Sequence, residues 1–253
     1  MTDFLTTDDG QRIAYKRHIG RADAPCFIWC GGLKSDMEGS KAVYLHGWAQ
    51  RRDVNYIRFD YFGHGQSSGE FTDGTISRWT GDVGRVIRAL TAGPVVLFGS
   101  SMGGWASLLA ARAEAQVKAL ILINPAPDFT EKMVWASWDE ARRDMLETDG
   151  IVYEPSDYGE PYAYSKALIE DGRAQQILDD PIAFSGPVRI LQGEQDSVVP
   201  WEYSQKILPA LQSRDVHYIL VKGGDHSLSR EEDLKLLART ADAVLSDIDP
   251  ENA

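Results

Sequence analysis

The most informative segment of this sequence is a serine between two glycines, in Gly99-Ser100-Ser101-Met102-Gly103. A short apolar run, residues 95–98, precedes the segment, and a stretch with helical periodicity follows it. Between a strand and a helix, this G-x-S-x-G pattern puts its central serine on a sharp turn, from which the hydroxyl projects above the sheet. Glycines are needed because side chains there would collide with the turn and a neighbouring strand. The pattern predicts that Ser101, and not Ser100 at the variable position, is a nucleophile.

A serine hydroxyl needs a base to take its proton, and the base needs an acid to orient it. With this kind of serine turn, the chain order is serine, acid, histidine, and the partners stand on loops after later strands. Asp196 and His226 each follow an apolar run typical of a strand. Glu194 is an alternative acid, but we favour Asp196 because a short side chain at the loop turn reaches a histidine more readily. We predict a catalytic triad of Ser101, Asp196 and His226.

An oxyanion hole is also required, because the tetrahedral intermediate carries a negative oxygen that backbone N–H groups must stabilise. One donor is expected to be Met102, the residue after the nucleophile. The second should come from residues 31–36, which follow an early strand, and we assign it to Leu33. A His-Gly element that often fills such a loop is found instead at Leu45-His46-Gly47-Trp48. No strand and turn precede it, so we interpret it as part of a helix.

The remaining histidines have other expected roles. His64 lies in the turn after an earlier strand, within Asp60-Tyr61-Phe62-Gly63-His64-Gly65. It precedes the serine in the chain, which is the wrong order for the base, and we expect it at most to border the pocket. His18 and His217 lie within strand-like runs, where packing or surface roles are expected.

Apolar runs and helical stretches alternate along the chain. Residues 3–6 and 11–18, on either side of a turn, predict an opening hairpin. Further runs typical of buried strands are 26–30, 54–59, 95–98, 119–123, 188–191 and 216–221. Helical periodicity is found at 76–90, 102–113, 201–211 and 231–245. Short apolar strands that alternate with helices predict an α/β fold, in which a mostly parallel sheet lies between helices on both faces.

The alternation is interrupted at residues 127–185, which have no strong strand signal but many aromatic residues: Phe129, Trp135, Trp138, Tyr153, Tyr158, Tyr162, Tyr164 and Phe184. An insertion of this length in a compact domain is rarely a bare loop. We predict a small helical cap over the C-terminal edge of the sheet, where ligands bind in open α/β folds. Most of its aromatics should serve packing. The whole chain, residues 1–253, is expected to form one domain with this insertion.

The composition excludes several classes of function. Lys and Arg number 26 against 38 Asp and Glu, and the net charge of −12 disfavours nucleic acid as a partner. No apolar run reaches the ~18 residues of a membrane span, and the first residues carry no secretory signal. Cys26 and Cys30 lie about 13 Å apart along one expected strand, too far for a disulfide. Reduced thiols and a cytoplasmic location are therefore expected.

Taken in this order, the motifs resemble the α/β-hydrolase superfamily over nearly the whole chain. Within it, the chain resembles the mitochondrial palmitoyl-protein thioesterases. That resemblance rests on Gly32-Leu33-Lys34-Ser35-Asp36-Met37-Glu38-Gly39-Ser40-Lys41, Ile57-Arg58-Phe59-Asp60-Tyr61-Phe62-Gly63-His64-Gly65 and Gly99-Ser100-Ser101-Met102-Gly103-Gly104-Trp105. It implies the α/β-hydrolase fold, with serine, acid and base at the three positions chosen above. We expect no transit peptide at the start of the chain, which would suggest a bacterial or cytosolic relative.

The expected activity is hydrolysis of a carboxylic ester or thioester with a largely apolar acyl or aryl group, by way of an acyl-enzyme. The expected partner is a small-molecule substrate or an acylated protein, and neither a metal nor an organic cofactor is required. Two alternatives stay open. One is a carbon–carbon bond hydrolase or lyase that uses the same triad, and the other is a non-catalytic module that binds a ligand.

Overall fold

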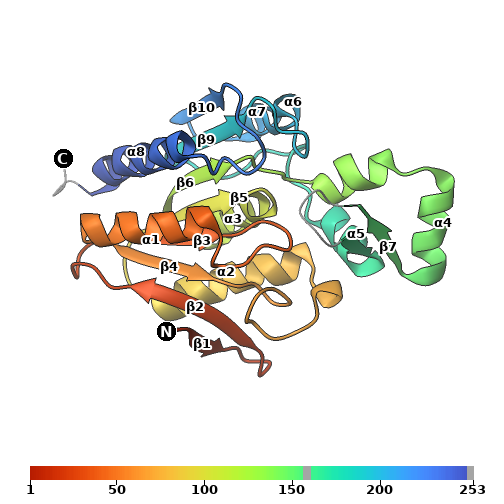
Figure 1. Ribbon diagram of the computed structural model, residues 1–253, viewed down its shortest axis with the longest axis horizontal. Coiled ribbons are helices and arrows are strands. Elements are labelled where there is room, and N and C mark those ends of the chain that lie inside the picture. Colours follow the sequence, from red (N-terminus) through yellow and green to blue (C-terminus); the bar gives the residue numbers. More distant parts are fainter. Residues whose placement is uncertain (156–160, 250–253) are drawn as a thin grey trace.

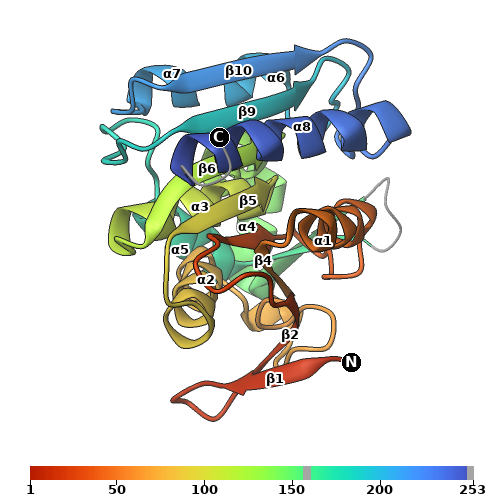
Figure 2. The ribbon, with the colours of Figure 1, turned by 90° about the vertical axis from the view of Figure 1, so that its left-hand side faces the viewer.

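Eight strands form one sheet in the computed structural model, which describes residues 1–155 and 161–249. Their order is β1-β2-β4-β3-β5-β6-β9-β10, seen from bottom to top in Figure 2. From β4 to β10 neighbouring strands are parallel, whereas β2 pairs antiparallel with both β1 and β4. The strands are β1 (Asp3–Thr6), β2 (Arg12–His18), β3 (Cys26–Cys30), β4 (Asn55–Phe59), β5 (Val95–Ser100), β6 (Val117–Ile123), β9 (Val188–Gly193) and β10 (Val216–Val221). The predicted α/β fold with a mostly parallel sheet and an opening hairpin is confirmed.

Helices cover both faces of the sheet because successive side chains of a strand point to opposite faces. Phe27 and Trp29 of β3 pack in a core with α1 and α8, whereas Ile28 packs in a second core with α2 and α3. Within the described residues, no helix has the length and apolar character that crossing a bilayer requires. The helices of this body are α1 (Ser40–Arg52), η1 (Phe71–Asp73), α2 (Ile76–Leu90), α3 (Met102–Ala113), α6 (Trp201–Ser204), α7 (Ile207–Ala210) and α8 (Glu231–Ile248).

The segment 201–211, predicted as one helix, is instead divided between α6 and α7. A continuous helix would need an N–H at Pro209 to donate to residue 205, and proline has none. Pro209 is tolerated in the first turn of a helix, where no such bond is made, and this is its position in α7. The break therefore follows from a single residue that the helical periodicity does not reveal.

Residues 127–185, which we call the cap segment, connect β6 to β9 and lie to one side of the sheet (Figure 1). The segment contains a two-stranded antiparallel sheet as well as the predicted helices. Its strands read Ile-Val-Tyr-Glu and Tyr-Ala-Tyr-Ser, in which apolar and polar residues do not alternate as in a half-buried strand. Tyr158, one of the expected cap aromatics, lies outside the described residues. The elements are η2, a π-helix (Thr130–Trp135), α4 (Glu140–Asp149), β7 (Ile151–Glu154), β8 (Tyr162–Ser165) and α5 (Lys166–Ala174).

Cys26 and Cys30 are free thiols buried on β3, which confirms the prediction that they are not paired. Burial raises the pKa of each thiol to about 12, because a thiolate is poorly solvated in the core. We expect no reaction of either thiol with Ellman's reagent within minutes at pH 8 in the native protein, and full reaction of both in guanidinium chloride. Rapid release of one equivalent of thionitrobenzoate from native protein would contradict this.

Candidate active site

Ser101 lies at the turn from β5 into α3, with φ 53° and ψ −119°. This conformation costs about 1–3 kcal/mol for a residue with a side chain, so the surroundings must hold it. The Ser101 N–H donates to the carbonyl oxygen of Ile123 at 2.9 Å, and the Ser101 carbonyl accepts from Ala126 at 3.1 Å. Gly103 is needed because a Cβ there would lie 2.2 Å from the carbonyl oxygen of Cys30. The strained turn holds the hydroxyl at the end of the sheet, as the motif predicts.

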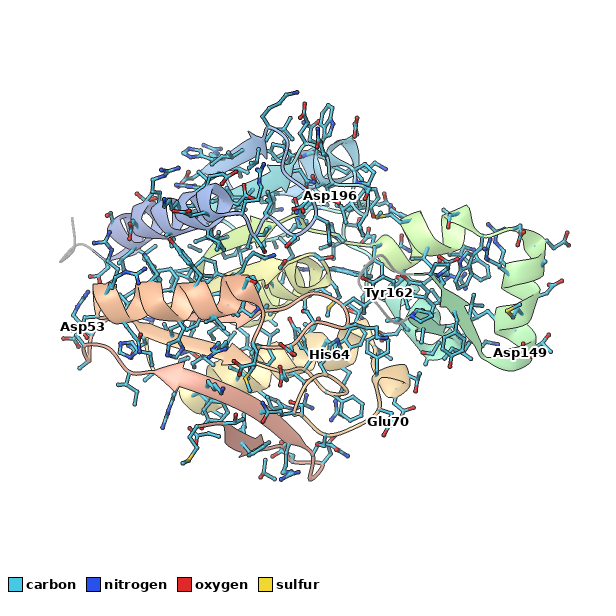
Figure 3. The ribbon with its side chains drawn as sticks, in the orientation of Figure 1. Asp53, His64, Glu70, Asp149, Tyr162 and Asp196 are labelled. Atoms are coloured by element: carbon cyan, nitrogen blue, oxygen red, sulfur yellow. The ribbon has the colours of Figure 1, made fainter. Side chains whose placement is uncertain are left out.

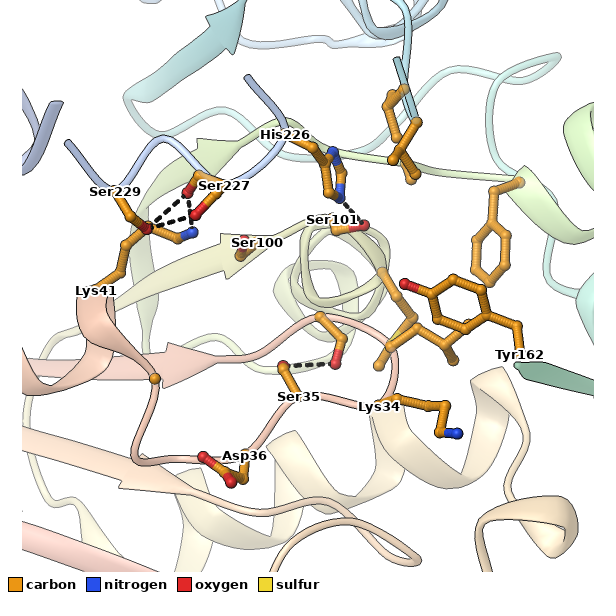
Figure 4. A pocket seen from close by; sticks show the side chains of 18 of the residues that line it. Lys34, Ser35, Asp36, Lys41, Ser100, Ser101, Tyr162, His226, Ser227 and Ser229 are labelled. Atoms are coloured by element: carbon orange, nitrogen blue, oxygen red, sulfur yellow. Dashed lines mark hydrogen bonds between the residues drawn. The ribbon is translucent and has the colours of Figure 1, made fainter. Parts of the chain in front are cut away.

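Ser101, His226 and Asp196 form a continuous row of hydrogen-bonded side chains. The Ser101 Oγ lies 3.1 Å from His226 Nε2, the contact drawn in Figure 4, and His226 Nδ1 lies 2.7 Å from Asp196 Oδ2. The Asp196 side chain is fully buried, and its Oδ1 accepts the N–H groups of Val198 at 2.9 Å and Val199 at 2.8 Å. A carboxylate held in this way keeps the Nδ1 proton of the imidazole on its own side. The other nitrogen, Nε2, is thereby directed at the serine as a proton acceptor.

Glu194, the alternative acid, has different partners. Its Oε1 forms an ion pair with Lys222, and its Oε2 accepts the N–H of Gly223 at 3.1 Å. The hydrogen bond from Lys222 is the main reason that the pKa of Glu194 lies below its usual value. The structure therefore places Asp196, and not Glu194, against His226.

A residue that the sequence analysis missed, Asn124, ties the loops of the acid and the base together. It directly follows β6, is fully buried and has a φ of 44°. Its Nδ2 donates to the carbonyl oxygens of Asp225 at 3.1 Å and His226 at 2.7 Å, and its Oδ1 accepts the N–H of Gly193 at 2.7 Å. An asparagine before a proline indicates only a turn, so nothing in the sequence pointed to this bridge.

Leu33 and Met102, the expected oxyanion donors, line the same cavity as Ser101. Neither backbone N–H donates to an acceptor within residues 1–155 and 161–249. Leu33 lies in a tight turn. The Gly32 carbonyl oxygen accepts hydrogen bonds from the Ser35 N–H at 3.2 Å and from the Ser35 hydroxyl at 2.7 Å. The arrangement can present two donors beside the serine, and their role in catalysis stays a prediction. The His-Gly element at residues 45–48 lies on α1, as interpreted.

A cavity of about 560 Å³ opens at Ser101 and has two chemically different walls. Figure 3 shows Tyr162 where the cap segment meets the body, and Figure 4 shows it across Ser101 from Lys41, Ser227 and Ser229. The wall on the side of the cap is mainly apolar, with Ala126, Phe129, Met133, Val134, Tyr162, Tyr164, Val198 and Val199. The opposite wall is polar, with Ser35, Asp36, Ser40, Lys41, Ser227 and Ser229. Trp135 and Trp138 do not line the cavity, in keeping with the packing role expected of most aromatics.

Lys41, at the start of α1, carries an amino group in the polar wall and was not anticipated from the sequence; Lys34 lines the same cavity. Its ammonium group donates to the carbonyl oxygen of Ser227, on the loop of His226. Burial lowers the pKa of Lys41 to about 8, an effect that Asp225 and Asp233 partly oppose.

His64, expected at most at the border of the pocket, is absent from its lining. In the described part of the chain, no three His, Cys, Asp or Glu side chains are grouped so that they could hold a metal ion.

Comparison with known proteins shows the family to which this chain belongs. The model of the alpha/beta hydrolase family matches residues 42–240. The bovine mitochondrial palmitoyl-protein thioesterase ABHD10 is 35% identical over 245 residues, which cover 96% of this chain and 79% of that protein. The crystal structure of a putative hydrolase from Agrobacterium vitis S4 superimposes with a TM-score of 0.93 at 37% identity, covering 97% of this chain and 98% of the other. For mouse alpha/beta hydrolase domain-containing protein 10 the TM-score is 0.90 at 33% identity, with 98% and 99% covered. The chain therefore belongs to the alpha/beta hydrolase family.

Proposed function

We propose that this protein is a serine hydrolase that cleaves carboxylic esters or thioesters through an acyl-enzyme. The observation that carries the proposal is the row Ser101–His226–Asp196, with contacts of 3.1 and 2.7 Å, at the base of a cavity. The relatives support this choice of substrate bond, because the bovine protein is named as a palmitoyl-protein thioesterase.

The geometry suggests the following reaction. Ser101 Oγ attacks the carbonyl carbon while its proton passes to His226 Nε2, 3.1 Å away. The N–H groups of Leu33 and Met102 stabilise the negative oxygen of the tetrahedral intermediate. The intermediate collapses when the leaving alcohol or thiol takes the proton from His226 and the acyl group stays on Ser101. Water then gives a proton to His226 and attacks the acyl-enzyme. The second tetrahedral intermediate collapses as His226 returns that proton to Ser101 Oγ, which releases the carboxylic acid and restores the serine.

The two walls of the cavity suggest how the substrate is oriented. An apolar acyl or aryl group is best accommodated by the cap-side wall, which includes Phe129, Met133 and Val134, because its burial there removes apolar surface from water. The polar wall around Lys41 and Ser229 suits the leaving group, which in a small-molecule ester or an acylated protein is the more polar half.

A matched series of p-nitrophenyl esters and acyl thioesters, from acetyl to palmitoyl, tests the proposed function. We expect turnover of both classes, with kcat/KM rising as the chain lengthens until the cavity is filled. A fluorophosphonate should label the protein once, and peptide mass spectrometry should find the label on Ser101. Absence of both turnover and labelling across the series would refute the proposal.

Val134, on η2, is positioned to limit the length of the acyl group. Val134→Phe adds an aromatic ring to the cap-side wall of the cavity. We expect kcat/KM for octanoyl and longer esters to fall about tenfold, with acetyl ester hydrolysis nearly unchanged, because a few methylene contacts carry about 1–3 kcal/mol of discrimination. Met145→Phe is the matched control, since Met145 is exposed on α4 within the same cap segment. An equal loss for all chain lengths would contradict the assignment of the acyl group to this wall.

A further inference from the structure

The turn that carries Leu33 contains a strained backbone. Residues 32–35 form a β-turn closed by the Ser35 N–H and the Gly32 carbonyl, and Lys34 is its third residue. Lys34 has a φ of 58°. A left-handed backbone costs a residue with a side chain about 1–2 kcal/mol. Such a conformation persists only where contacts around it hold it in place.

The His64 side chain forms a hydrogen bond with the backbone of this turn. The backbone N–H of Lys34 donates to Nε2 of His64 at 3.1 Å. The other ring nitrogen, Nδ1, lies 3.1 Å from the carbonyl oxygen of Phe62 and donates to it. The same segment supports the far end of the loop, where Asp60 Oδ1 accepts the N–H of Met37 at 2.7 Å. The turn after β4 thus accepts hydrogen bonds from two backbone N–H groups of the segment 31–37, which carries Leu33.

The His64 ring is enclosed and uncharged. The residue is only 4% exposed, and the rings of Tyr61, Phe71 and Trp79 surround it with centroids 5.2 to 5.7 Å away. Burial lowers the pKa of His64 to about 4, because an imidazolium ion would be poorly solvated there. With its proton on Nδ1, the neutral ring points the lone pair of Nε2 at the Lys34 N–H. Both the position and the protonation of the ring therefore suit an acceptor.

We propose that His64 is a positioning residue for the oxyanion hole. By accepting the Lys34 N–H, His64 fixes the peptide group between Leu33 and Lys34, so that the Leu33 N–H faces the negative oxygen formed at Ser101. The inference rests on the proposed hydrolase function. His64 acts through Lys34 and Leu33 and does not line the cavity. A donor to the oxyanion matters most once charge develops, so its misalignment should lower kcat and leave KM nearly unchanged.

His64→Phe tests this, because phenylalanine keeps an aromatic ring among its neighbours and removes the acceptor. We expect kcat for ester hydrolysis to fall about 10- to 100-fold, less than the ~10²–10³-fold of deleting an oxyanion donor outright. A trifluoromethyl ketone, which forms an oxyanion when Ser101 adds to it, should bind more weakly by about the same factor. The affinity for the corresponding methyl ketone, which stays a neutral carbonyl because it lacks the activating fluorines, should change no more than about twofold.

Two further variants separate this role from a merely structural one. Trp79→Phe removes the other hydrogen bond to the Phe62 carbonyl, from Trp79 Nε1 at 3.1 Å, without touching Lys34. It should cost stability in a thermal melt but leave kcat and ketone affinity within about threefold of wild type. His64→Gln offers an oxygen acceptor at the same position. Its kcat and its affinity for the trifluoromethyl ketone should lie between those of wild type and His64→Phe.

The outcomes are distinct. A folded His64→Phe protein that keeps wild-type kcat and ketone affinity would overturn the inference. If His64→Phe does not fold, the glutamine variant decides, and losses no greater than those of Trp79→Phe would count against the role of His64. Failure of the proposed function itself gives another result, because the wild-type protein would then neither hydrolyse esters nor bind the trifluoromethyl ketone.

Discussion

Ser101→Ala is expected to lower kcat for ester and thioester hydrolysis about 10⁶-fold, the loss measured when the serine of a comparable triad is removed. The reason is that, in the part of the chain that the structure describes, the Ser101 hydroxyl is the group placed to attack the carbonyl carbon and pass its proton to His226 Nε2. Fluorophosphonate labelling should disappear in the same variant. The turn should survive, since alanine keeps the Ser101 backbone bonds to Ile123 and Ala126. Initial rates at saturating substrate and a thermal melt measure the two effects.

Ser246→Ala is the matched control, because Ser246 is exposed on α8 and bonds only the Asp242 carbonyl within the described residues. It should keep full activity and full labelling. Near-wild-type turnover by a folded Ser101→Ala protein would eliminate the acyl-enzyme mechanism.

Asp196→Asn is expected to lower kcat about 10⁴-fold, as in the corresponding substitution of a serine protease triad. The carboxylate accepts the Nδ1 proton of His226 at 2.7 Å, and an amide can instead turn an N–H toward the ring. That arrangement favours the other tautomer, with the proton on Nε2, so the histidine can no longer take the proton of Ser101. Glu194→Gln loses only an ion pair with Lys222 and should keep kcat within about threefold.

The comparison of these two variants decides which carboxylate orients the base. Each keeps the size of the side chain and removes one negative charge, so a general effect of charge should be equal in both. A greater loss of kcat in Glu194→Gln than in Asp196→Asn would transfer the role of the acid to Glu194.

Much of the site could be anticipated because its parts carry local signals. Ser101 stands out because strand, tight turn and helix are continuous in the chain, and the glycines around it meet a steric need within a few residues. Asp196 and His226 each follow a parallel strand, and the carboxyl ends of parallel strands meet at one edge of a sheet. The two strands also follow one another in the chain, and successive parallel strands are usually neighbours in a sheet, as β9 and β10 are, so their loops are expected to lie near each other.

Predictions failed where a local signal was too weak or misleading. The strands β7 and β8 read Ile-Val-Tyr-Glu and Tyr-Ala-Tyr-Ser, which lack the alternation of apolar and polar residues that indicates a strand. Residues 201–211 have helical periodicity, but the missing N–H of Pro209 divides them between two helices.

The sequence alone determined the strands of the main sheet, most of the helices that cover it and the three side chains of the hydrogen-bonded row, since these depend on patterns within short stretches. Only the tertiary structure decided what His64, Asn124 and Lys41 do. Their partners lie 30, 101 and 186 residues away in the chain, respectively at the Lys34 N–H, the Asp225 carbonyl and the Ser227 carbonyl. A buried polar group must find a partner wherever the fold provides one, and no pattern of neighbouring residues specifies which distant backbone atom that will be.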